Sequence, residues 1–398
     1  MAPASSGSGL PRWLTRLVVI FVVIIVALAS CAARTPRFEG PASANFDGTR
    51  FHNPTPVVKS VTDLLRWQMT REPGQWQFRK AAGNAEAPPQ RVDGTTIRST
   101  FVNHATVLIQ TGGVNILTDP IWSERASPLA WAGPKRFTGA GIAFADLPPI
   151  DAVLVSHNHF DHMDLPTLAR LASAHAPVFV VPLGNAAYLR QAGIDKIVEL
   201  DWWQHLSVGE VTVHAVPAKH WSRRGLFDTN RALWAGYYLT QPEASVFFAG
   251  DTGMGEHFAE IRQRLGAPDL ALLPIGAYLP RWFMEPQHID PAEAVQAHDQ
   301  LGARYGMAIH FGTFALGDDG QDQGVADLQR ALAAASAETT EFWIPLEGES
   351  RVFSRDREWA SLQTAERRGI DRSFTTESGS HCLHPLCADA GRKGQAMR

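Results

Sequence analysis

The chain has 398 residues, of which 45% are hydrophobic and 19% are charged, and its formal net charge is −4 at neutral pH. This composition is ordinary for a globular protein with a sizeable core, and the slightly acidic balance argues against a nucleic-acid-binding surface, which needs a strongly basic face. Fifteen histidines direct attention to metal binding instead.

The N-terminus carries the first informative pattern, because Arg12 and Arg16 precede an apolar run over residues 17–29. This run is shorter than the ~20 residues that a helix needs to cross a bilayer. A basic start, a short apolar stretch and small residues before a cleavage point indicate a secretory signal. The sequence "LASC" at 28–31 resembles a bacterial lipoprotein box, in which Cys31 carries the lipid. An uncleaved anchor and an ordinary signal peptide are the alternatives.

These features predict a lipoprotein-type signal segment over residues 1–31 and a Pro-, Ala- and Ser-rich tether over 32–45. We expect one folded domain over 46–355 and a loosely ordered C-terminal extension over 356–398, where Cys382 and Cys387 are open to pairing in an oxidising compartment. The expected location is the bacterial cell envelope, as a membrane-anchored lipoprotein that faces the periplasm or the exterior.

Short β-branched or aromatic runs bounded by turn residues predict strands within 46–355, at 97–102, 105–110, 114–117, 152–155, 177–181, 211–216, 234–239, 246–249, 270–273 and 307–309. Helical patterns occur at 62–69, 165–174, 186–192, 256–265, 291–301 and 323–335. Asp290 is a suitable cap for a helix that begins at Pro291. Strands mixed with helices in this way predict a layered α/β fold.

Four of the predicted strands each lead into a side chain that can bind a metal. These side chains are His157, His220, Asp251 and His310. Because sites in α/β sheets gather beyond the strand ends, we expect the four to meet in one crevice. For the last three, an ordinary capping or turn role is the alternative.

The stretch "SHNHFDHMD" at 156–164 adds His157, His159, Asp161 and His162 in close alternation. A pair of divalent metals that share a water needs about seven or eight nitrogen and oxygen ligands, and imidazole and carboxylate suit zinc, iron or manganese. The alternation lets two histidines grip one metal while the next two side chains turn to a second. A carboxylate such as Asp251 has two oxygens and can bridge both.

The pattern H-x-H-x-D-H followed by isolated His, Asp and His resembles the metallo-β-lactamase superfamily. That resemblance implies an αββα sandwich with a dinuclear metal site at the strand ends. Longer stretches resemble the N-acyl-phosphatidylethanolamine-hydrolysing phospholipases D: "NHATVLIQ", "LTDPIWSERASP", "GDTG", "PIGAYLPRWFMEPQHIDPAEAVQAH" and "AIHFGTFAL". The fourth stretch, at 274–298, discriminates best, and the likeness covers roughly 46–353. The lipoprotein-like N-terminus departs from the animal members of that family.

The resemblance implies a zinc-dependent phosphodiesterase that releases N-acylethanolamine and phosphatidic acid through a metal-bridging hydroxide. In that picture one zinc takes His157, His159 and His220, the second takes Asp161, His162 and His310, and Asp251 bridges them. Asp161 thereby belongs to the catalytic set as well. Iron and manganese remain alternatives to the two zinc ions.

Four further side chains are candidates for supporting roles. His288 is a candidate acid for the leaving alkoxide, or a residue that orients phosphate, or simply a helix-entry residue. Asp119 and His104 are candidates for orienting a ligand imidazole, with a plain turn role as the alternative. Arg281 is a candidate phosphate-binding or groove-lining residue, or else packs structurally.

The expected partners are a phospholipid substrate and a membrane surface, with no nucleic acid. The oligomeric state is open, with a homodimer as one option. A metal-dependent lactonase or other ester hydrolase of the same fold is the alternative function, since the same hydroxide would attack a carbonyl. A lipid-binding envelope lipoprotein with a vestigial site is a third interpretation, which the presence of all seven candidate ligands disfavours.

Overall fold

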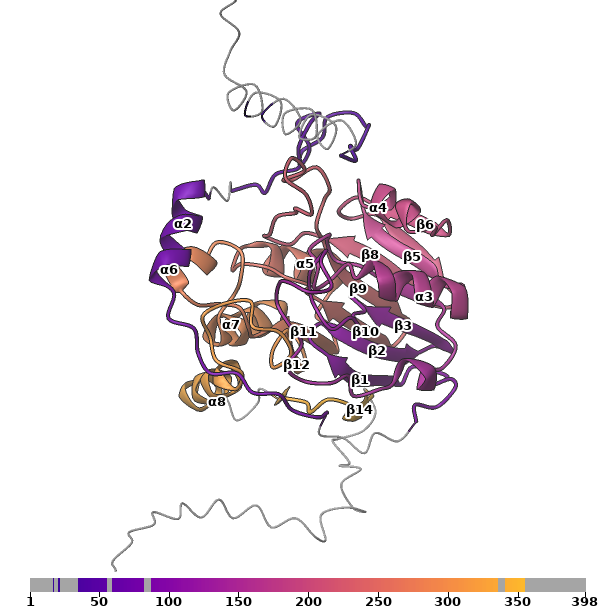
Figure 1. The fold of residues 1–398 in the computed structure, drawn as a ribbon. Coiled ribbons are helices and arrows are strands. Elements are labelled where there is room, and N and C mark those ends of the chain that lie inside the picture. Colours follow the sequence, from indigo (N-terminus) through magenta and orange to yellow (C-terminus); the bar gives the residue numbers. More distant parts are fainter. Residues whose placement is uncertain are drawn as a thin grey trace, which may run out of the picture. The chain divides into compact units, whose positions relative to one another are not determined.

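The protein is described by a computed structural model that covers residues 35–55, 59–81, 87–335 and 341–354, together with Leu17 and Phe21. Its centre is a pair of seven-stranded sheets (Figure 1). The first sheet contains, in spatial order, β14 (Ser350–Phe353), β1 (Ile97–Asn103), β2 (Thr106–Thr111), β3 (Val114–Thr118), β4 (Ala152–Leu154), β5 (Val178–Pro182) and β6 (Ile197–Leu200). The second contains β13 (Glu341–Trp343), β12 (Tyr305–Ile309), β11 (Leu270–Pro274), β10 (Ala244–Phe248), β9 (Gly236–Gln241), β8 (Val211–Val216) and β7 (His205–Val208).

The two sheets are joined by a core of side chains from both inner faces. Ile109 and Ile116 of the first sheet and Val213, Phe248 and Met307 of the second belong to one buried cluster. Each large apolar side chain buried in this way contributes about 1.5–3 kcal/mol to folding. This shared core holds the two sheets face to face.

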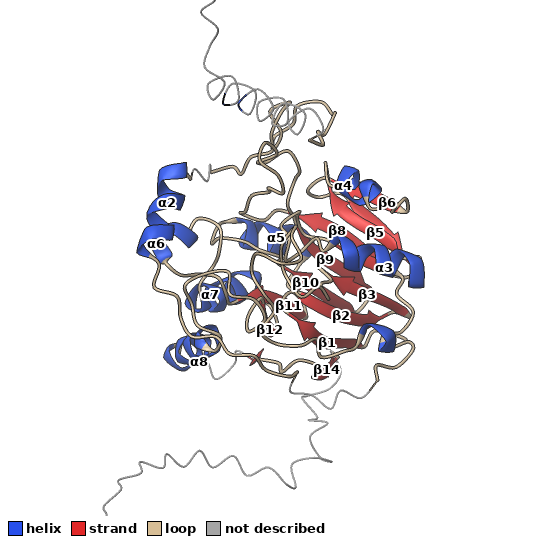
Figure 2. Cartoon of the chain, viewed as in Figure 1, coloured by secondary structure: helices blue, strands red, loops and turns tan. Residues whose placement is uncertain are grey.

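Helices cover the outer faces of both sheets (Figure 2). The first sheet packs against α3 (Leu165–His175) and α4 (Ala186–Gln191), and the second against α5 (His257–Leu265), α7 (Pro291–Leu301) and α8 (Gln323–Ala334). A short 3-10 helix, η1, spans Phe144–Asp146. The predicted αββα sandwich is therefore confirmed, with helices outside two apposed sheets.

Two smaller helices lie side by side at one flank, α2 (Val61–Thr70) and α6 (Arg281–Met284) (Figure 1). They meet where the rings of Trp67 and Phe283 stack with centroids 4.8 Å apart. The outer surface of this pair leaves Leu65, Met69 and Trp282 exposed.

The helix starts follow the local chemistry that the sequence indicates. Asp290 caps α7 as predicted, because its side chain accepts a hydrogen bond from the Glu293 N–H at 2.8 Å. The helix predicted over 62–69 starts at Val61, and its cap is Ser60, which exchanges hydrogen bonds with Asp63 in a capping box. The helix therefore begins slightly earlier than its apolar pattern suggests.

The ten predicted strands all occur, with ends that shift by up to two residues. Four observed strands were not predicted: β6, β7, β13 and β14. All four stand at the edges of the two sheets and are largely half-buried or exposed. An edge strand has one neighbour and needs no continuous apolar run, which explains why its sequence signal is weak.

The aromatic side chains of the N-terminal part of the domain pack onto the sandwich. Phe46 and Phe51 are buried in a cluster with Trp234, and Phe38, within the expected tether, lies 5.2 Å from Phe46 between ring centroids. Trp76 contacts Phe137. These aromatic side chains therefore cover the fold, whereas Trp67 belongs to the flank formed by α2 and α6.

Several predictions fall outside the described residues, including those for Cys31, Cys382 and Cys387 and for the extension over 356–398. Among the helices of the described part of the chain, none combines the length and apolar character needed to span a membrane.

Candidate metal centre

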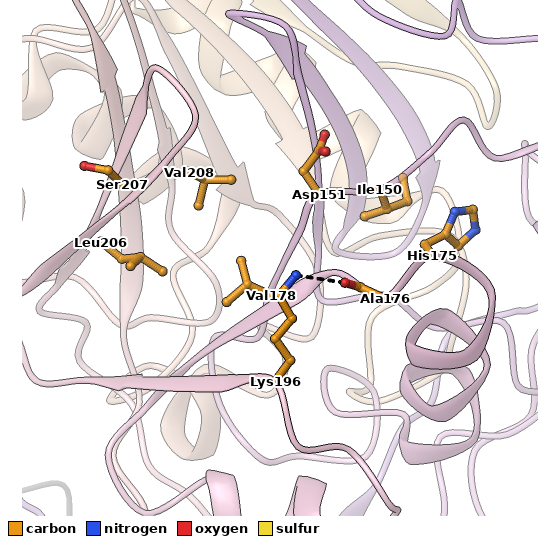
Figure 3. Close-up of a pocket in the computed structure, with 9 residues that line it drawn as sticks. All are labelled: Ile150, Asp151, His175, Ala176, Val178, Lys196, Leu206, Ser207 and Val208. Carbon is orange, nitrogen blue, oxygen red and sulfur yellow. Dashed lines mark hydrogen bonds between the residues drawn. The ribbon is translucent and has the colours of Figure 1, made fainter.

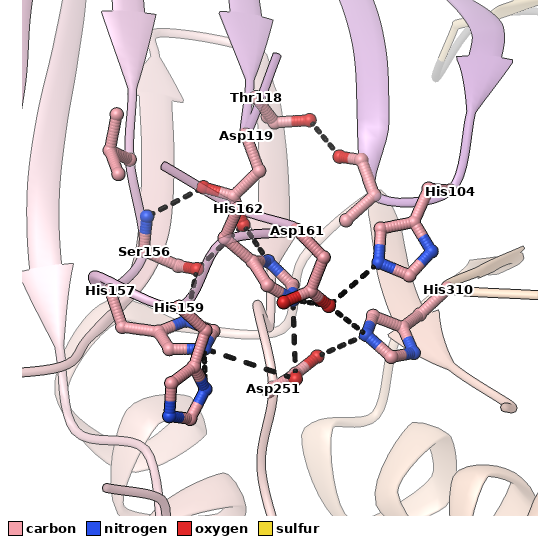
Figure 4. A network of polar contacts seen from close by, with 12 residues as sticks. His104, Thr118, Asp119, Ser156, His157, His159, Asp161, His162, Asp251 and His310 are labelled. Atoms are coloured by element: carbon pink, nitrogen blue, oxygen red, sulfur yellow. Dashed lines mark hydrogen bonds and ion pairs between the residues drawn. The ribbon is translucent and has the colours of Figure 1, made fainter. Parts of the chain in front are cut away.

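Polar side chains from four strand ends meet at one edge of the sandwich, and Figure 4 shows three of them, His157, Asp251 and His310. His157 follows β4, His220 follows β8, Asp251 follows β10 and His310 follows β12. The parallel pairing of β10, β11 and β12 places the last two ends at the same edge. The seven predicted ligands all fall into groups whose ligand atoms lie within 4.8 Å of one another. They converge as expected, and their assignment as ligands stays a prediction.

Three imidazoles form the first group. His157 Nε2 lies 2.8 Å from His159 Nδ1, and His220 Nε2 lies 3.3 Å from the same nitrogen. Burial lowers the pKa of His157 and His220 well below the ordinary value, and it lowers the pKa of His159 to about 4. All three rings are therefore neutral at pH 7.

The second nitrogen of two of these rings fixes the tautomer. His220 Nδ1 lies 3.0 Å from the backbone carbonyl oxygen of Gln287, which can only accept a hydrogen bond. His157 Nδ1 lies 2.9 Å from Ser156 Oγ, whose own hydrogen is donated to Asp119 at 2.6 Å. Both rings thus carry the proton on Nδ1 and present a lone pair at Nε2. Lone pairs that converge in this way are stabilised by a cation.

The second group surrounds the Asp161 carboxylate. Its Oδ2 lies 3.1 Å from His162 Nε2 and 3.4 Å from His310 Nε2. Burial lowers the pKa of His310, but the Asp251 and Asp161 carboxylates outweigh it and raise the pKa to about 9. The same balance raises the pKa of His162 well above its ordinary value. A metal that enters this group must displace these protons.

Asp251 stands between the two groups. Its Oδ1 lies 3.1 Å from His310 Nε2, and its Oδ2 lies 3.2 Å from His162 Nε2. The same Oδ2 is 4.0 Å from His157 Nε2 and 3.8 Å from His220 Nε2. This is the position that the predicted bridging role requires.

The donor set fits a pair of divalent cations. His162 Nε2 and Asp251 Oδ2, and likewise His310 Nε2 and Asp251 Oδ1, are ion-paired at 3.2 and 3.1 Å. His162 Nε2, His310 Nε2 and Asp251 Oδ1 nevertheless lack a well-directed hydrogen bond among the described residues. Buried polar atoms without such bonds are costly, so three of them at one point indicate a ligand that completes the site. Five imidazoles and two carboxylates suit zinc, iron or manganese.

Asp119 lies directly behind the metal-ligand side chains. It is fully buried, and its Oδ2 contacts His162 Nδ1 at 2.6 Å. It also accepts hydrogen bonds from the Ser156 N–H and hydroxyl, each at 2.6 Å. Asp119 thus holds His162 directly and His157 through Ser156, which is the geometry of the orienting role expected from the sequence.

His288 lies at the same edge, in the turn between α6 and α7. Its Nδ1 is 3.9 Å from Asp251 Oδ2 and has no hydrogen-bond partner within the described part of the chain. Burial lowers the pKa of His288 to about 3, against the opposing effect of the Asp251 charge. The imidazole is therefore neutral at pH 7 and carries a single N–H donor beside Asp251.

Arg281 supports the turn that carries His288. Its Nη1 donates to the His288 carbonyl oxygen at 2.9 Å, and its other nitrogens face Glu293 at 2.8 Å and Asp290 at 3.6 Å. The guanidinium is therefore engaged by two carboxylates. Contact between Arg281 and a substrate stays a prediction. Its hydrogen bond to the His288 carbonyl and its ion pair with Glu293 show that it also stabilises the turn.

His104 lies closer to the centre than the sequence indicated. Its Nε2 is 3.0 Å from Asp161 Oδ2, and its carbonyl oxygen accepts from the His310 N–H at 2.7 Å. The backbone φ angles of His104, Asp119 and His310 are 49°, 34° and 61°. Non-glycine residues rarely adopt such angles, and they cluster at functional sites where the surroundings enforce them.

Sequence reasoning missed three contributors to the site. Ser156 stands in the quoted "SHNHFDHMD" stretch, and its position between a strand and His157 is a weak signal. Gln287 acts through its backbone carbonyl, for which no side-chain pattern exists. Lys59 lies more than 200 positions before His288, yet its charge lowers the pKa of that imidazole.

A separate cavity of about 450 Å³ lies at the opposite ends of the strands (Figure 3). Asp151 directly precedes β4 and Val178 begins β5, so this cavity is remote from the ends that carry the histidines. Lys196 spans it and donates to the Ala176 carbonyl oxygen at 3.0 Å. None of the predicted site residues lines it.

Comparisons with known proteins give a consistent picture. A family model described as a beta-lactamase superfamily domain matches residues 114–311. An uncharacterized protein of Mycobacterium tuberculosis is 36% identical over 330 residues, which are 81% of this chain and 86% of that protein. The N-acyl-phosphatidylethanolamine-hydrolyzing phospholipase D 1 of Caenorhabditis elegans is 39% identical over 230 residues, which are 55% of this chain and 65% of that protein.

The chain thus spans slightly less than two thirds of the worm enzyme. Among solved structures, an isothiocyanate hydrolase from Delia radicum gut bacteria aligns with a TM-score of 0.52 and 21% identity, over 65% of this chain and 99% of that one. At this identity the likeness speaks for the fold alone.

Proposed function

The chain belongs to the metallo-β-lactamase superfamily and is a metal-dependent hydrolase, and on that premise we propose that it is a zinc-dependent phospholipase D. The proposed substrates are N-acyl-phosphatidylethanolamine and related phospholipids, and the products are N-acylethanolamine and phosphatidic acid. The observation that carries the proposal is the convergence of seven nitrogen and oxygen donors beside His288, in a chain similar to an enzyme named for this reaction.

The choice of a phosphodiester depends on more than the metal donors, which serve many hydrolases. The stretch 274–298, on which the likeness to phospholipases of this type is most specific, forms α6, the turn with His288 and α7. This stretch brings His288 to within 3.9 Å of Asp251. The segment that suggests the substrate thus lies at the metal centre itself.

Two zinc ions, when bound, supply a water nucleophile at neutral pH and neutralise charge on the phosphoryl oxygens. Asp119 and Ser156 hold the imidazoles of His162 and His157 in the tautomers that expose Nε2. His288 holds a proton on a neutral ring and can donate it in a hydrogen bond to a phosphoryl or leaving-group oxygen. Since burial keeps the pKa of His288 near 3, positioning of the phosphate is its better-supported role.

An amphiphilic substrate also needs an apolar approach to the site. The flank formed by α2 and α6 exposes Leu64, Leu65, Met69 and Trp282, and α6 leads directly into the turn with His288. Exposed apolar side chains gathered in this way are typical of surfaces that contact lipid or protein. With the lipoprotein-like N-terminus, they support a location at an envelope membrane, where enzyme and lipid meet in two dimensions.

The decisive test is product identification. Purified protein, loaded with zinc, iron or manganese in separate samples, would be incubated with a panel of phospholipids and with acyl-homoserine lactones, and the products followed by mass spectrometry. We expect N-acylethanolamine and phosphatidic acid, formed fastest with zinc. Ring-opened lactone without phospholipid cleavage would support the alternative ester hydrolase and overturn the proposal.

A further inference from the structure

Lys59 is a cation placed in an unusual environment. It lies just before α2, its side chain is half-buried, and its Nζ lies 3.8 Å from the centroid of the Phe283 ring. The ammonium nitrogen is shielded from solvent and has no hydrogen-bond partner among the residues that the structure describes. An ammonium group has three N–H donors, and those of Lys59 have no acceptor among the described residues.

The surroundings stabilise the positive charge of Lys59 only in part. The face of an aromatic ring attracts a cation, and the Asp63 carboxylate acts in the same direction. That carboxylate, however, accepts hydrogen bonds from the Ser60 N–H and hydroxyl. Burial lowers the pKa of Lys59 to about 7 in spite of the Asp63 charge. A buried charge without a direct counter-ion is costly unless a partner arrives.

The position of Lys59 connects it to the metal centre. Phe283, on which the ammonium lies, belongs to α6, and the His288 N–H donates to the carbonyl oxygen of Met284 at the end of that helix, at 2.9 Å. His288 in turn faces Asp251. The ammonium of Lys59 therefore packs on the helix that leads directly into the turn with His288.

The other cation beside this turn cannot serve in the same way. Arg281 is paired with Glu293 at 2.8 Å and faces Asp290 at 3.6 Å, so two carboxylates neutralise its charge. Of these two side chains, Lys59 is the one whose N–H donors have no hydrogen-bond partner among the described residues. A shielded cation without a hydrogen-bond partner among the described residues thus stands on a segment remote in sequence from His288.

We propose that Lys59 Nζ binds a non-bridging oxygen of an anionic phosphodiester and so selects this substrate class over neutral esters. The inference rests on the proposed function, and it adds a discriminating group outside the metal centre. A phosphodiester carries one negative charge at every pH near neutrality, whereas a lactone or carboxylic ester carries none at the reacting group. The ammonium would gain a hydrogen bond and a counter-ion only from the charged substrate.

The test compares three variants with the full-length, metal-loaded protein. Lys59→Met removes the charge and keeps the apolar stem, and Lys59→Arg keeps the charge. Lys135→Met is a matched control, because Lys135 also lies over a phenylalanine ring, with its Nζ 4.4 Å from the Phe78 centroid, but is exposed. The probes are bis(p-nitrophenyl) phosphate as an anionic substrate, p-nitrophenyl acetate as a neutral one, and diethyl phosphate for calorimetric binding.

For Lys59→Met we expect KM for the anionic substrate and Kd for diethyl phosphate to rise about tenfold or more, the scale of a hydrogen bond to a charged group. Hydrolysis of the neutral ester and metal content should stay within about twofold, and Lys59→Arg and Lys135→Met should resemble the parent protein. Equal losses on both substrates, or unchanged phosphate binding in a folded Lys59→Met protein, would overturn the proposal.

The binding measurement separates this inference from the proposed function. If diethyl phosphate binds the parent protein and binds Lys59→Met more weakly, the anion site stands even when no phospholipid is cleaved. If the parent protein and Lys59→Met cleave phospholipid equally and bind diethyl phosphate equally, the phospholipase activity is supported and the anion site at Lys59 is ruled out. Thermal unfolding of each variant shows whether it is folded.

Discussion

Asp119 Oδ2 lies 2.6 Å from Nδ1 of His162, although 43 residues separate the two in the chain. The parallel pairing of β3 with β4 creates this contact, because Asp119 follows the first strand and the histidine loop follows the second. The carboxylate holds the ring so that Nε2 faces Asp161 and Asp251. Asp119 thereby orients His162, a candidate metal ligand, without being a predicted ligand itself.

Replacing Asp119 with asparagine should weaken metal binding by about 10–100-fold, because His162 and, through Ser156, His157 lose the carboxylate that orients them. Competition with a chromophoric zinc chelator would measure the change. A replacement of the exposed Asp146 by asparagine serves as the control. Unchanged metal affinity in Asp119→Asn would contradict the orienting role.

Asp251→Asn tests the bridge. Since the carboxylate faces histidines of both groups, we expect the metal content to fall toward one ion or none per chain, and turnover to fall with it. Elemental analysis of the dialysed protein gives the stoichiometry. Retention of two ions with normal turnover would rule out bridging by Asp251.

Substituting alanine for His288 should leave metal content near the parent value and lower kcat by roughly 10²–10³-fold, the usual effect of removing one hydrogen-bond donor to the reacting group. The side chain lies 3.9 Å from Asp251 and forms a group with His220 and Asp251, but each of the two predicted metal positions keeps its other ligands when His288 is removed. Elemental analysis and steady-state kinetics on the same preparation separate the two effects. Loss of metal would instead place His288 among the ligands.

The buried ammonium of Lys59 predicts a pH-dependent stability. Its pKa is about 7 in the folded protein and 10.5 when unperturbed, so between these values the unfolded chain binds the extra proton. The free energy of unfolding should therefore rise as pH increases from about 7 to 10.5, by roughly 1–3 kcal/mol. Urea unfolding of Lys59→Met should lack this rise and show higher stability at pH 6. A rise of equal size in both proteins would exclude Lys59 as its source.

Replacing Cys31 with alanine should release the protein from the membrane fraction, because the proposed lipid is attached there. Cell fractionation and labelling with radioactive palmitate would follow the change. Cys382→Ala is a matched control, since it removes a cysteine outside the proposed lipoprotein box. Unchanged membrane association and labelling in Cys31→Ala would remove the lipoprotein proposal.

The central strands and the ligand set could be read from the chain because their signals are local. A continuous apolar run such as 246–249 needs no partner to be recognised, and the close alternation of His157, His159, Asp161 and His162 is rare by chance. The edge strands β6, β7, β13 and β14 escaped because each is half-buried and stabilised by its single neighbour. Each of these strands forms because a neighbouring strand is available to pair with it, which the local sequence does not reveal.

Supporting roles were harder to predict, because each depends on contacts between distant segments. Asp119 and His104 looked like turn residues as much as site residues until their contacts with His162 and Asp161 were seen. Arg281 looked available for phosphate, but it is paired with Glu293. Lys59 carried no sequence signal at all.

By itself, the sequence determined the donor chemistry, the layered α/β class and the strand ends at which the donors stand, since these depend on residue type and short-range periodicity. Only the tertiary structure decided which nitrogen of His157, His162 and His220 faces the centre, which carboxylate faces both groups, and how far the Lys59 ammonium is shielded from solvent. The physical reason is that hydrogen-bond direction, desolvation and charge pairing depend on distances between segments that folding alone brings together.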